Sequence, residues 1–360
     1  MAEGSSNEVS ISQPTPPTEP KDSPDDSHIS SHRDETPQIA PDHWLQDLEL
    51  LHQYCTSTYR TLSGRNDVHD MWQIIIPRIA FSCDFLMHGL LALSALHLAH
   101  LQQYKRRRYY IISTYHQNLA IGGFRSALPN VTQQSADSVM VSAIIIALFA
   151  FASSAMKSTD PNESFTLNEV AELLVLVRGI EDTLAAGNTR RWVYEGPLAS
   201  MLMVPGGDRA NPTTSAKDRE IFSTHFAEVQ KLIDRRKDDF PPEVVASLNE
   251  GLVELERTYE VMLKSNPVMN SGYIMRWPNV ISMDFLFLIQ QRNPIALIIL
   301  SLFCAMLHYH EDRWIWYQWP ARVIDLSRQS LDPEWHKWIE WPKDVAAKNM
   351  KYINNEHYGS

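Results

Sequence analysis

Three long apolar stretches limit what this chain can fold into, because residues 85–101, 139–156 and 295–307 are apolar on nearly every side. Stretches of this kind are typical of helices buried at the centre of a protein or of membrane-spanning helices. The mean hydropathy of the whole chain is −0.27, and no belt of Trp and Tyr brackets each stretch as it would at the two faces of a membrane. We therefore predict central helices of a helical bundle and no membrane span.

Apolar residues elsewhere recur at three- and four-residue spacing, which is the pattern of amphipathic helices. The pattern is found at residues 44–59, 218–236 and 242–263. Pro77 interrupts or ends a short apolar stretch at 71–76. The sequence lacks the strict alternation of apolar and polar residues that is typical of strands. It therefore predicts an all-α fold, a single large helical bundle over residues 42–360.

The first 41 residues differ in composition from the rest of the chain. They are rich in Pro and Ser, poor in apolar residues, and without the basic start and apolar run of a secretory signal. A segment of this composition buries too little apolar surface to offset the entropy lost on ordering. We predict a disordered tail over residues 1–41.

Charge and cysteine content exclude several classes of protein. The 32 basic and 43 acidic residues give a formal net charge of −11, so the chain as a whole does not attract a polyanion and direct nucleic-acid binding is not expected. None of the three cysteines has a partner at Cys-x-x-Cys spacing, which excludes a disulfide scaffold and a zinc site built mainly on thiolates. A cytoplasmic and/or nuclear location fits this composition best.

Motifs for metal, cofactor or nucleophile chemistry are missing from the sequence. The pairs His97 with His100 and His308 with His310 do not make the His-Glu-x-x-His helix of a zinc enzyme. The chain has no Gly-x-Ser-x-Gly elbow and no glycine-rich phosphate loop. We therefore predict no metal and no cofactor.

A basic run and a tryptophan-rich end each allow two interpretations. Residues 105–108 read Lys-Arg-Arg-Arg. The favoured interpretation is a solvated helix end at the negative pole of the helix dipole, and the alternative is a nuclear import signal or an anion patch. Six of the ten tryptophans fall within residues 314–341. The favoured interpretation is that these tryptophans hold short terminal helices to the bundle. The alternative is that some of them form the walls of an apolar ligand pocket.

Several phrases, read in order, resemble one known family. They are Leu-Leu-His-Gln-Tyr at 50–54, Gly-Leu-Leu-Ala-Leu-Ser-Ala-Leu-His at 89–97, Val-Arg-Gly-Ile at 177–180, Glu-Gly-Pro-Leu at 195–198 and Trp-Ile-Glu-Trp-Pro at 338–342. Together they resemble the C-terminal regulatory domain of fungal zinc-cluster transcription factors, especially the sterol uptake control proteins, over about residues 44–345. The resemblance implies an all-α effector domain that encloses a hydrophobic ligand, a sterol in the best-known members.

The resemblance leaves three explanations of function open. Family members bind DNA through six cysteines that hold two zinc ions, and residues 1–41 contain no cysteine. We therefore expect a regulator without its own zinc-cluster domain, which senses a sterol- or terpenoid-like molecule and acts through protein partners or as a homodimer. One alternative is a repurposed secondary-metabolite enzyme, a cofactor-independent cyclase or pericyclase that uses the apolar pocket. The other is a chain whose zinc cluster is encoded upstream.

The residues of the predicted pocket are chosen from the density of aromatic and Met side chains. The lining candidates are Phe149, Phe151, Trp192, Tyr194, Met201, Met203, Phe285, Phe287, Phe303 and Met306. The polar candidates near them, which would also be the catalytic groups of an enzyme, are His88, His97, Glu195 and His308. A sensor pocket needs one or two polar groups to orient its ligand, whereas an enzyme pocket needs titratable groups with shifted pKa values.

Overall fold

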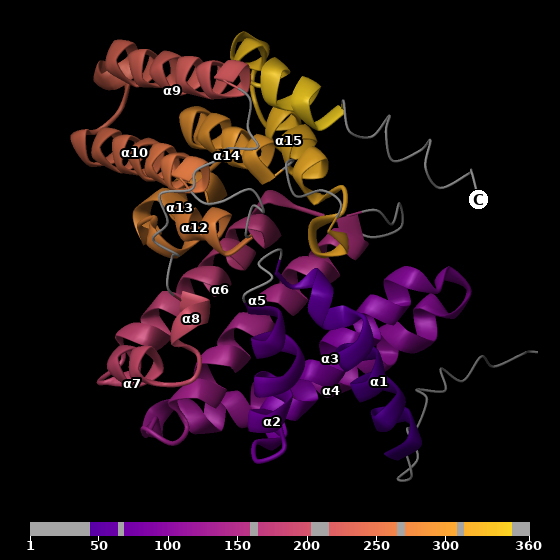
Figure 1. The fold of residues 1–360 in the computed structure, drawn as a ribbon. Helices are drawn as coiled ribbons and strands as arrows, with labels where there is room; N and C mark the ends of the chain where they lie inside the picture. Colours follow the sequence, from indigo (N-terminus) through magenta and orange to yellow (C-terminus); the bar gives the residue numbers. More distant parts are fainter. Residues whose placement is uncertain are drawn as a thin grey trace, which may run out of the picture. The chain divides into compact units, whose positions relative to one another are not determined.

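The computed structural model describes residues 44–63, 68–158, 165–202, 216–264, 271–307 and 313–347. Every regular element in these ranges is a helix, and Figure 1 labels most of the longer ones. The prediction of an all-α fold is confirmed. The tail predicted over residues 1–41 lies outside the described residues.

The N-terminal group of helices is built around a helical hairpin. α3 (Asp84–Leu101) and α4 (Arg106–Ala127) pack side by side, and α1 (Trp44–Thr56) and α5 (Ala136–Ser158) cover α3. α3 is buried from Gly89 to Ala99 without a break, as its uniformly apolar sequence predicts. These four helices run from indigo to magenta in Figure 1.

A short π turn precedes Pro77. The π turn η3 (Met71–Ile75) leads directly into α2 (Ile76–Ala80), and Pro77 lies in the first turn of α2. One helical element thus ends at Ile75, just before Pro77, and Pro77 lies in the first turn of the next. A proline is tolerated in the first turn of a helix because its missing N–H has no helical partner there.

α6 (Leu167–Ala185) connects the N-terminal group to the C-terminal group. It begins with a capping box, in which Thr166 Oγ1 accepts a hydrogen bond from the Glu169 backbone N–H (3.3 Å) and Glu169 accepts one from the Thr166 backbone N–H (2.8 Å). α6 packs against α5, which precedes it in the chain, and against α12 and α13, which follow it. The short helices α7 (Thr189–Glu195) and α8 (Ala199–Leu202) follow it.

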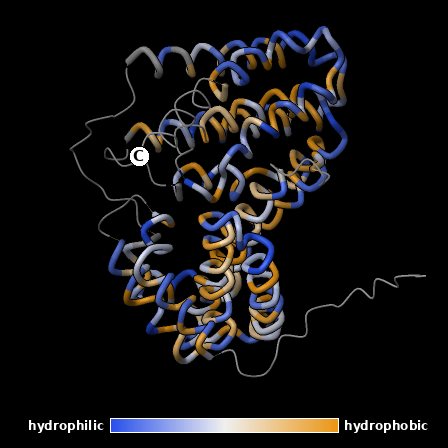
Figure 2. The backbone as a smooth tube through the Cα atoms, turned by 90° about the vertical axis from the view of Figure 1, so that its right-hand side faces the viewer, coloured by the Kyte–Doolittle hydropathy of each residue, from blue (hydrophilic) through white to orange (hydrophobic). Residues whose placement is uncertain are grey.

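The C-terminal group surrounds α14, which is buried at every residue from Ile295 to Leu307. Its neighbours are α9, α10, α13 and α15. Figure 2 shows hydrophobic turns in orange and hydrophilic turns in blue alternating along the outer helices, as expected of amphipathic helices. The helices of this group are α9 (Ala216–Arg236), α10 (Pro242–Lys264), α11 (Ser271–Ile274), α12 (Arg276–Val280), α13 (Met283–Gln290), α14 (Pro294–Leu307) and α15 (Trp319–Gln329), with the 3-10 helices η8 (Trp314–Trp316) and η9 (Pro333–Trp338) and a last helix over 340–347.

The longest apolar helices pass a membrane-span test by length and composition. Asp84–Leu101 and Ala136–Lys157 qualify alone, and Met283–Gln290 with Pro294–Leu307 qualifies as a pair bent by 103°. In the structure 67% and 72% of the first two helices' most apolar windows are buried inside the protein. Their apolar surface is thus largely used in helix packing, and the absence of a membrane span stays a prediction.

The tryptophans near the C-terminus hold distant parts of the chain together. Trp314 Nε1 donates to Thr61 Oγ1 (2.9 Å), and Trp319 Nε1 donates to Ser154 Oγ (3.0 Å). Trp316 and Trp319 also pack edge-on against Phe151. These contacts agree with the interpretation that short terminal elements are held to the bundle by their indoles.

Candidate functional site

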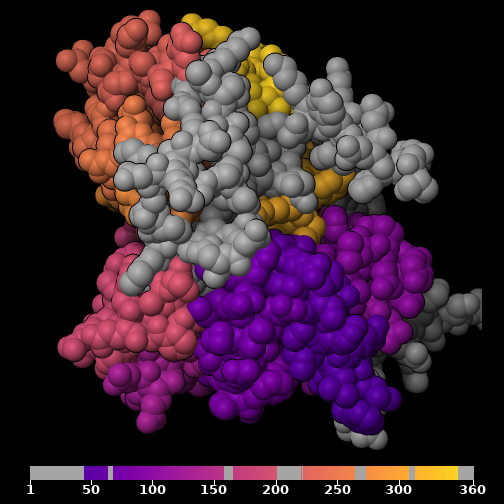
Figure 3. All heavy atoms as spheres, in the orientation of Figure 1, coloured from indigo at the N-terminus to yellow at the C-terminus, as the bar shows by residue number. Residues whose placement is uncertain are grey.

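A groove between α1 and α3 combines apolar walls with acidic and imidazole groups. Its cavity volume is about 200 Å³, below the roughly 300–1,000 Å³ of drug-sized ligand sites, so it fits a small molecule or one end of a larger one. Figure 3 shows the indigo atoms of α1 at the surface in this view. The groove is lined by Asp47, Leu48, Leu51, Asp84, Met87, His88 and Leu91.

Helical spacing explains why these residues meet. Asp84, His88 and Leu91 follow one another at four- and three-residue steps along α3, which places them on one face of that helix. Asp47 and Leu51 are four residues apart on α1 and share a face in the same way. Because α1 packs on α3, the two faces form the two walls of the groove.

Three side chains from three helices form a hydrogen-bonded relay at this groove. His88 Nδ1 of α3 lies 3.0 Å from His116 Nδ1 of α4, and His116 Nε2 lies 3.3 Å from Asp47 Oδ1 of α1. His116 is buried, with 3% of its surface exposed. We refer to His88, His116 and Asp47 as the relay.

The carboxylate of Asp47 fixes the direction of the hydrogen bonds in the neutral relay. An ionised carboxylate only accepts hydrogen bonds, so His116 carries its proton on Nε2 and its Nδ1 is an acceptor. His88 must then donate from Nδ1 to His116, which leaves the lone pair of His88 on Nε2. The relay therefore gives His88 an accepting nitrogen that has no partner among the described residues.

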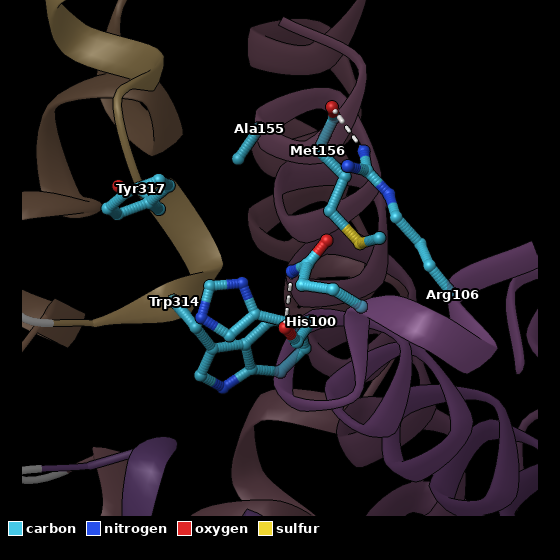
Figure 4. Close-up of a pocket in the computed structure, with 7 residues that line it drawn as sticks. His100, Arg106, Ala155, Met156, Trp314 and Tyr317 are labelled. Atoms are coloured by element: carbon cyan, nitrogen blue, oxygen red, sulfur yellow. Dashed lines mark hydrogen bonds between the residues drawn. The ribbon is translucent and has the colours of Figure 1, made fainter. Parts of the chain in front are cut away.

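A second hollow lies where α3 and α5 end near η8, and Figure 4 shows its lining. Its volume is about 60 Å³, which is room for a few water molecules. The Arg106 guanidinium donates to the Met156 carbonyl at 3.0 Å, and Gln103 donates to the His100 carbonyl at 2.7 Å, as the dashed lines show. Trp314 and Tyr317 close the side opposite Arg106 (Figure 4).

His97 does not line this hollow but packs against Trp314, which does. Its ring stacks on Trp314 with 4.8 Å between ring centroids, and its Nδ1 is 2.9 Å from Thr58 Oγ1. Burial, with a smaller effect of His100, lowers the pKa of His97 to about 4. His97 is thus uncharged at neutral pH and helps to hold Trp314 against α3.

Three of the phenylalanines predicted to line one pocket belong to the hydrophobic core and contact different tryptophans. Phe285 and Phe303 pack against Trp277, with ring centroids 5.7 Å and 4.6 Å from it. Phe151 packs instead against Trp316 and Trp319. All three phenylalanines are at most 1% exposed.

The other predicted residues are placed as follows. Phe149 and Met306 are buried in the hydrophobic core, while Trp192 is half-buried. Tyr194 and Phe287 are exposed, at 38% and 55%. Glu195 is exposed and pairs with Arg191. The side chain of Met201, and the whole of Met203 and His308, lie outside the described residues. A role for these residues in binding or catalysis stays a prediction.

The basic run is at the opposite helix pole from the one we expected. Arg106, Arg107 and Arg108 form the first turn of α4, whereas the sequence favoured a position at the negative, C-terminal pole of a helix. The correction arises because α3 ends at Leu101 and Gln102 breaks the helix before α4 begins. Three guanidinium groups therefore lie at the N-terminus of α4, which is the positive pole of its dipole.

Among the residues that the structure describes, no group of three or more His, Cys, Asp or Glu side chains is arranged to hold a metal ion. Asp47, Asp84 and His88 line one groove but do not form such a group. The groove residues Asp47 and Asp84, and His116 of the relay, were not recognised in the sequence. The four-residue spacing of Asp84 and His88 was a usable signal, but pairing His116 with His88 requires the register of the α3–α4 hairpin.

The helical architecture and the comparisons define the class of this protein. A family model described as the fungal specific transcription factor domain matches residues 49–251, which extend from α1 to the middle of α10. This match covers more than half of the chain. The chain therefore belongs to the family of fungal specific transcription factor domains.

Three named relatives are similar to this chain. A Zn(2)-C6 fungal-type transcription factor of Gibberella zeae is 23% identical over 330 residues, 88% of this chain and 65% of the relative. Another Zn(2)-C6 fungal-type transcription factor, from Aspergillus fumigatus, is 25% identical over 260 residues, 70% of this chain and 65% of the relative. Sterol uptake control protein 2 of Saccharomyces cerevisiae is 30% identical over 147 residues, 39% of this chain and 15% of the relative. The chain thus spans less than two thirds of the length of each.

Proposed function

We propose that this protein is a transcription regulator whose helical domain responds to a hydrophobic, sterol- or terpenoid-like molecule. The observation that carries the proposal is the family match over residues 49–251, together with the names of the relatives as transcription factors. The sterol uptake control protein supports the ligand class, although it aligns with only 39% of this chain. In this proposal the protein acts in the nucleus through protein partners or as a homodimer.

One observation favours a second candidate function. The relay places hydrogen-bonded titratable groups beside an apolar groove, which is an arrangement that general acid–base catalysis uses. The second candidate is therefore an enzyme that transforms a lipophilic intermediate in this groove without a cofactor. In that reaction Nε2 of His88 would accept the proton that the substrate loses.

Deleting the gene in the source organism separates the two functions. Transcripts and lipophilic metabolites are measured in the same cultures, and the deletion strain is complemented with the wild-type gene or with His88→Gln. A regulator is supported if sterol-pathway or neighbouring transcripts fall and the wild-type gene restores them. The regulator is overturned, and the enzyme supported, if transcripts hold steady while one product disappears and His88→Gln fails to restore it.

A further inference from the structure

While the relay is neutral, the polar groups of the α1–α3 groove all accept hydrogen bonds. Asp47 and Asp84 contribute carboxylates, and the neutral relay leaves His88 with an accepting Nε2. The seven lining residues include no Lys, Arg, Ser, Thr, Asn or Gln that would offer a donor. A molecule that satisfies these groups must itself bring hydrogen-bond donors.

The charge of the groove is negative. Asp84 is exposed in the first turn of α3 and makes no ion pair with any residue that the structure describes. Asp47 contacts the His116 imidazole of the relay and pairs with no Lys or Arg among the described residues. Two carboxylates without a Lys or Arg partner favour a positively charged occupant over a neutral one of the same shape.

The walls of the groove are apolar and open to solvent. Leu48 is 52% exposed, Leu51 and Met87 are half-buried, and Leu91 forms a buried floor. Covering such side chains is favourable, because it removes apolar surface from water. The volume of about 200 Å³ limits the covered part of a ligand to a short chain or a small ring.

From these three observations we propose that the groove binds a small organic ammonium ion. Its protonated nitrogen lies between Asp47, Asp84 and Nε2 of His88, and its hydrocarbon part lies on Leu48, Leu51 and Met87. This inference does not depend on the proposed function, because the binding belongs to the purified chain whether or not the protein regulates transcription.

Three six-carbon probes of similar size test the proposal on the full chain. Hexylammonium, hexanol and hexanoate are titrated at pH 7.5 and low salt, and binding is followed by the NMR signal of the ¹³C-labelled Met87 methyl group. We expect hexylammonium to bind at least ten-fold more tightly than hexanol, and hexanoate not to shift the signal. Equal binding of hexylammonium and hexanol, binding of hexanoate, or no shift of the Met87 signal with any probe would overturn the proposal.

Matched variants separate the charged contact from the apolar contact. Asp84→Asn should weaken hexylammonium binding about ten-fold and leave hexanol unchanged, whereas Leu48→Ser should weaken both probes. Asp238→Asn removes one charge from an exposed site in η6 (Lys237–Asp239) and should leave all three probes unaffected. All three substituted residues are exposed, and unchanged melting temperatures confirm that the variants fold. If Asp84→Asn and Asp238→Asn have the same effect on hexylammonium affinity, the contact between Asp84 and the ammonium group is refuted.

Discussion

Two adjacent glycines of α4 face different surroundings. A Cβ atom at Gly123 would lie 2.5 Å from the Cβ of Phe85 on α3, whereas one at Gly122 would meet nothing within 4 Å. An atom as close to the backbone as Phe85 Cβ cannot move aside without shifting α3. Gly123 is therefore the position that sets the close approach of the α3–α4 hairpin.

We expect Gly123→Ala to lower the free energy of unfolding by about 1–3 kcal/mol, because it overpacks the contact between the two helices. Gly122→Ala is the control, and it should raise the same free energy by up to about 1 kcal/mol because alanine favours the helix. Urea unfolding measures both. Equal effects of the two substitutions would show that the hairpin has room at Gly123.

Buried His97 should make stability depend on pH. Its pKa is about 4 in the folded protein and near 6.5 in the unfolded chain, so the unfolded chain binds the proton more readily between these values. Stability from this group is present above pH 6.5 and is lost as pH falls toward 4. We expect a loss of about 2 kcal/mol between pH 7 and pH 5.

The variant His97→Gln isolates this effect, because it should flatten the pH dependence of unfolding over the same range. His52→Gln changes an exposed histidine of α1 and should leave the dependence as it is in the wild type. If the two variants show the same slope of stability against pH, His97 is not the group responsible.

At the scale of helices, α4 carries basic residues at both poles of its dipole. Exposed Arg107 lies in the first turn and exposed Arg125 in the last turn. A cation destabilises a helix near its N-terminus and stabilises it near its C-terminus. Each effect changes the free energy of unfolding by about 0.3–1 kcal/mol at low salt. We expect Arg107→Glu to stabilise the protein and Arg125→Glu to destabilise it, as measured by thermal unfolding.

Salt provides the control for this pair of substitutions. Both effects should shrink in 1 M NaCl, because surface charges are screened at that concentration. Effects of the same sign, or effects that salt leaves unchanged, would exclude the helix dipole as their cause.

Local pattern explains how much of the fold was predictable. The helices α3, α5 and α14 were predicted nearly to their ends, because a continuous apolar run is a property of neighbouring residues. The basic run was predicted at the C-terminus of a helix but lies at the N-terminus of one. The helix break at Gln102 determines this position. In the groove, His88 was recognised, but His116 was not, since no local signal links residues 28 positions apart.

At the scale of the molecule, the boundary of the family match does not coincide with a structural boundary. Residue 251 lies inside α10, and its carbonyl accepts a hydrogen bond from Trp277 Nε1 at 2.8 Å. α14, which comes later, is buried throughout. A fragment over residues 44–251 would leave the partners of these later helices exposed to water.

We therefore expect the fragment 44–251 to aggregate or to lack near-UV circular dichroism, while a fragment over 44–347 unfolds in one cooperative thermal transition. Size-exclusion chromatography and circular dichroism of both fragments make the comparison. A monomeric 44–251 fragment with a cooperative transition would show that the matched region is an independent folding unit.

The bond between Trp319 and Ser154 joins residues 165 positions apart, and this distance has a consequence for synthesis on the ribosome. At about 5–20 residues per second, translation needs roughly ten to thirty seconds to deliver Trp319 after Ser154 has been made. During that interval the surface of α5 around Ser154, which Trp319 later covers, is exposed. We expect the nascent chain to be a client of ribosome-associated chaperones until its last helices emerge.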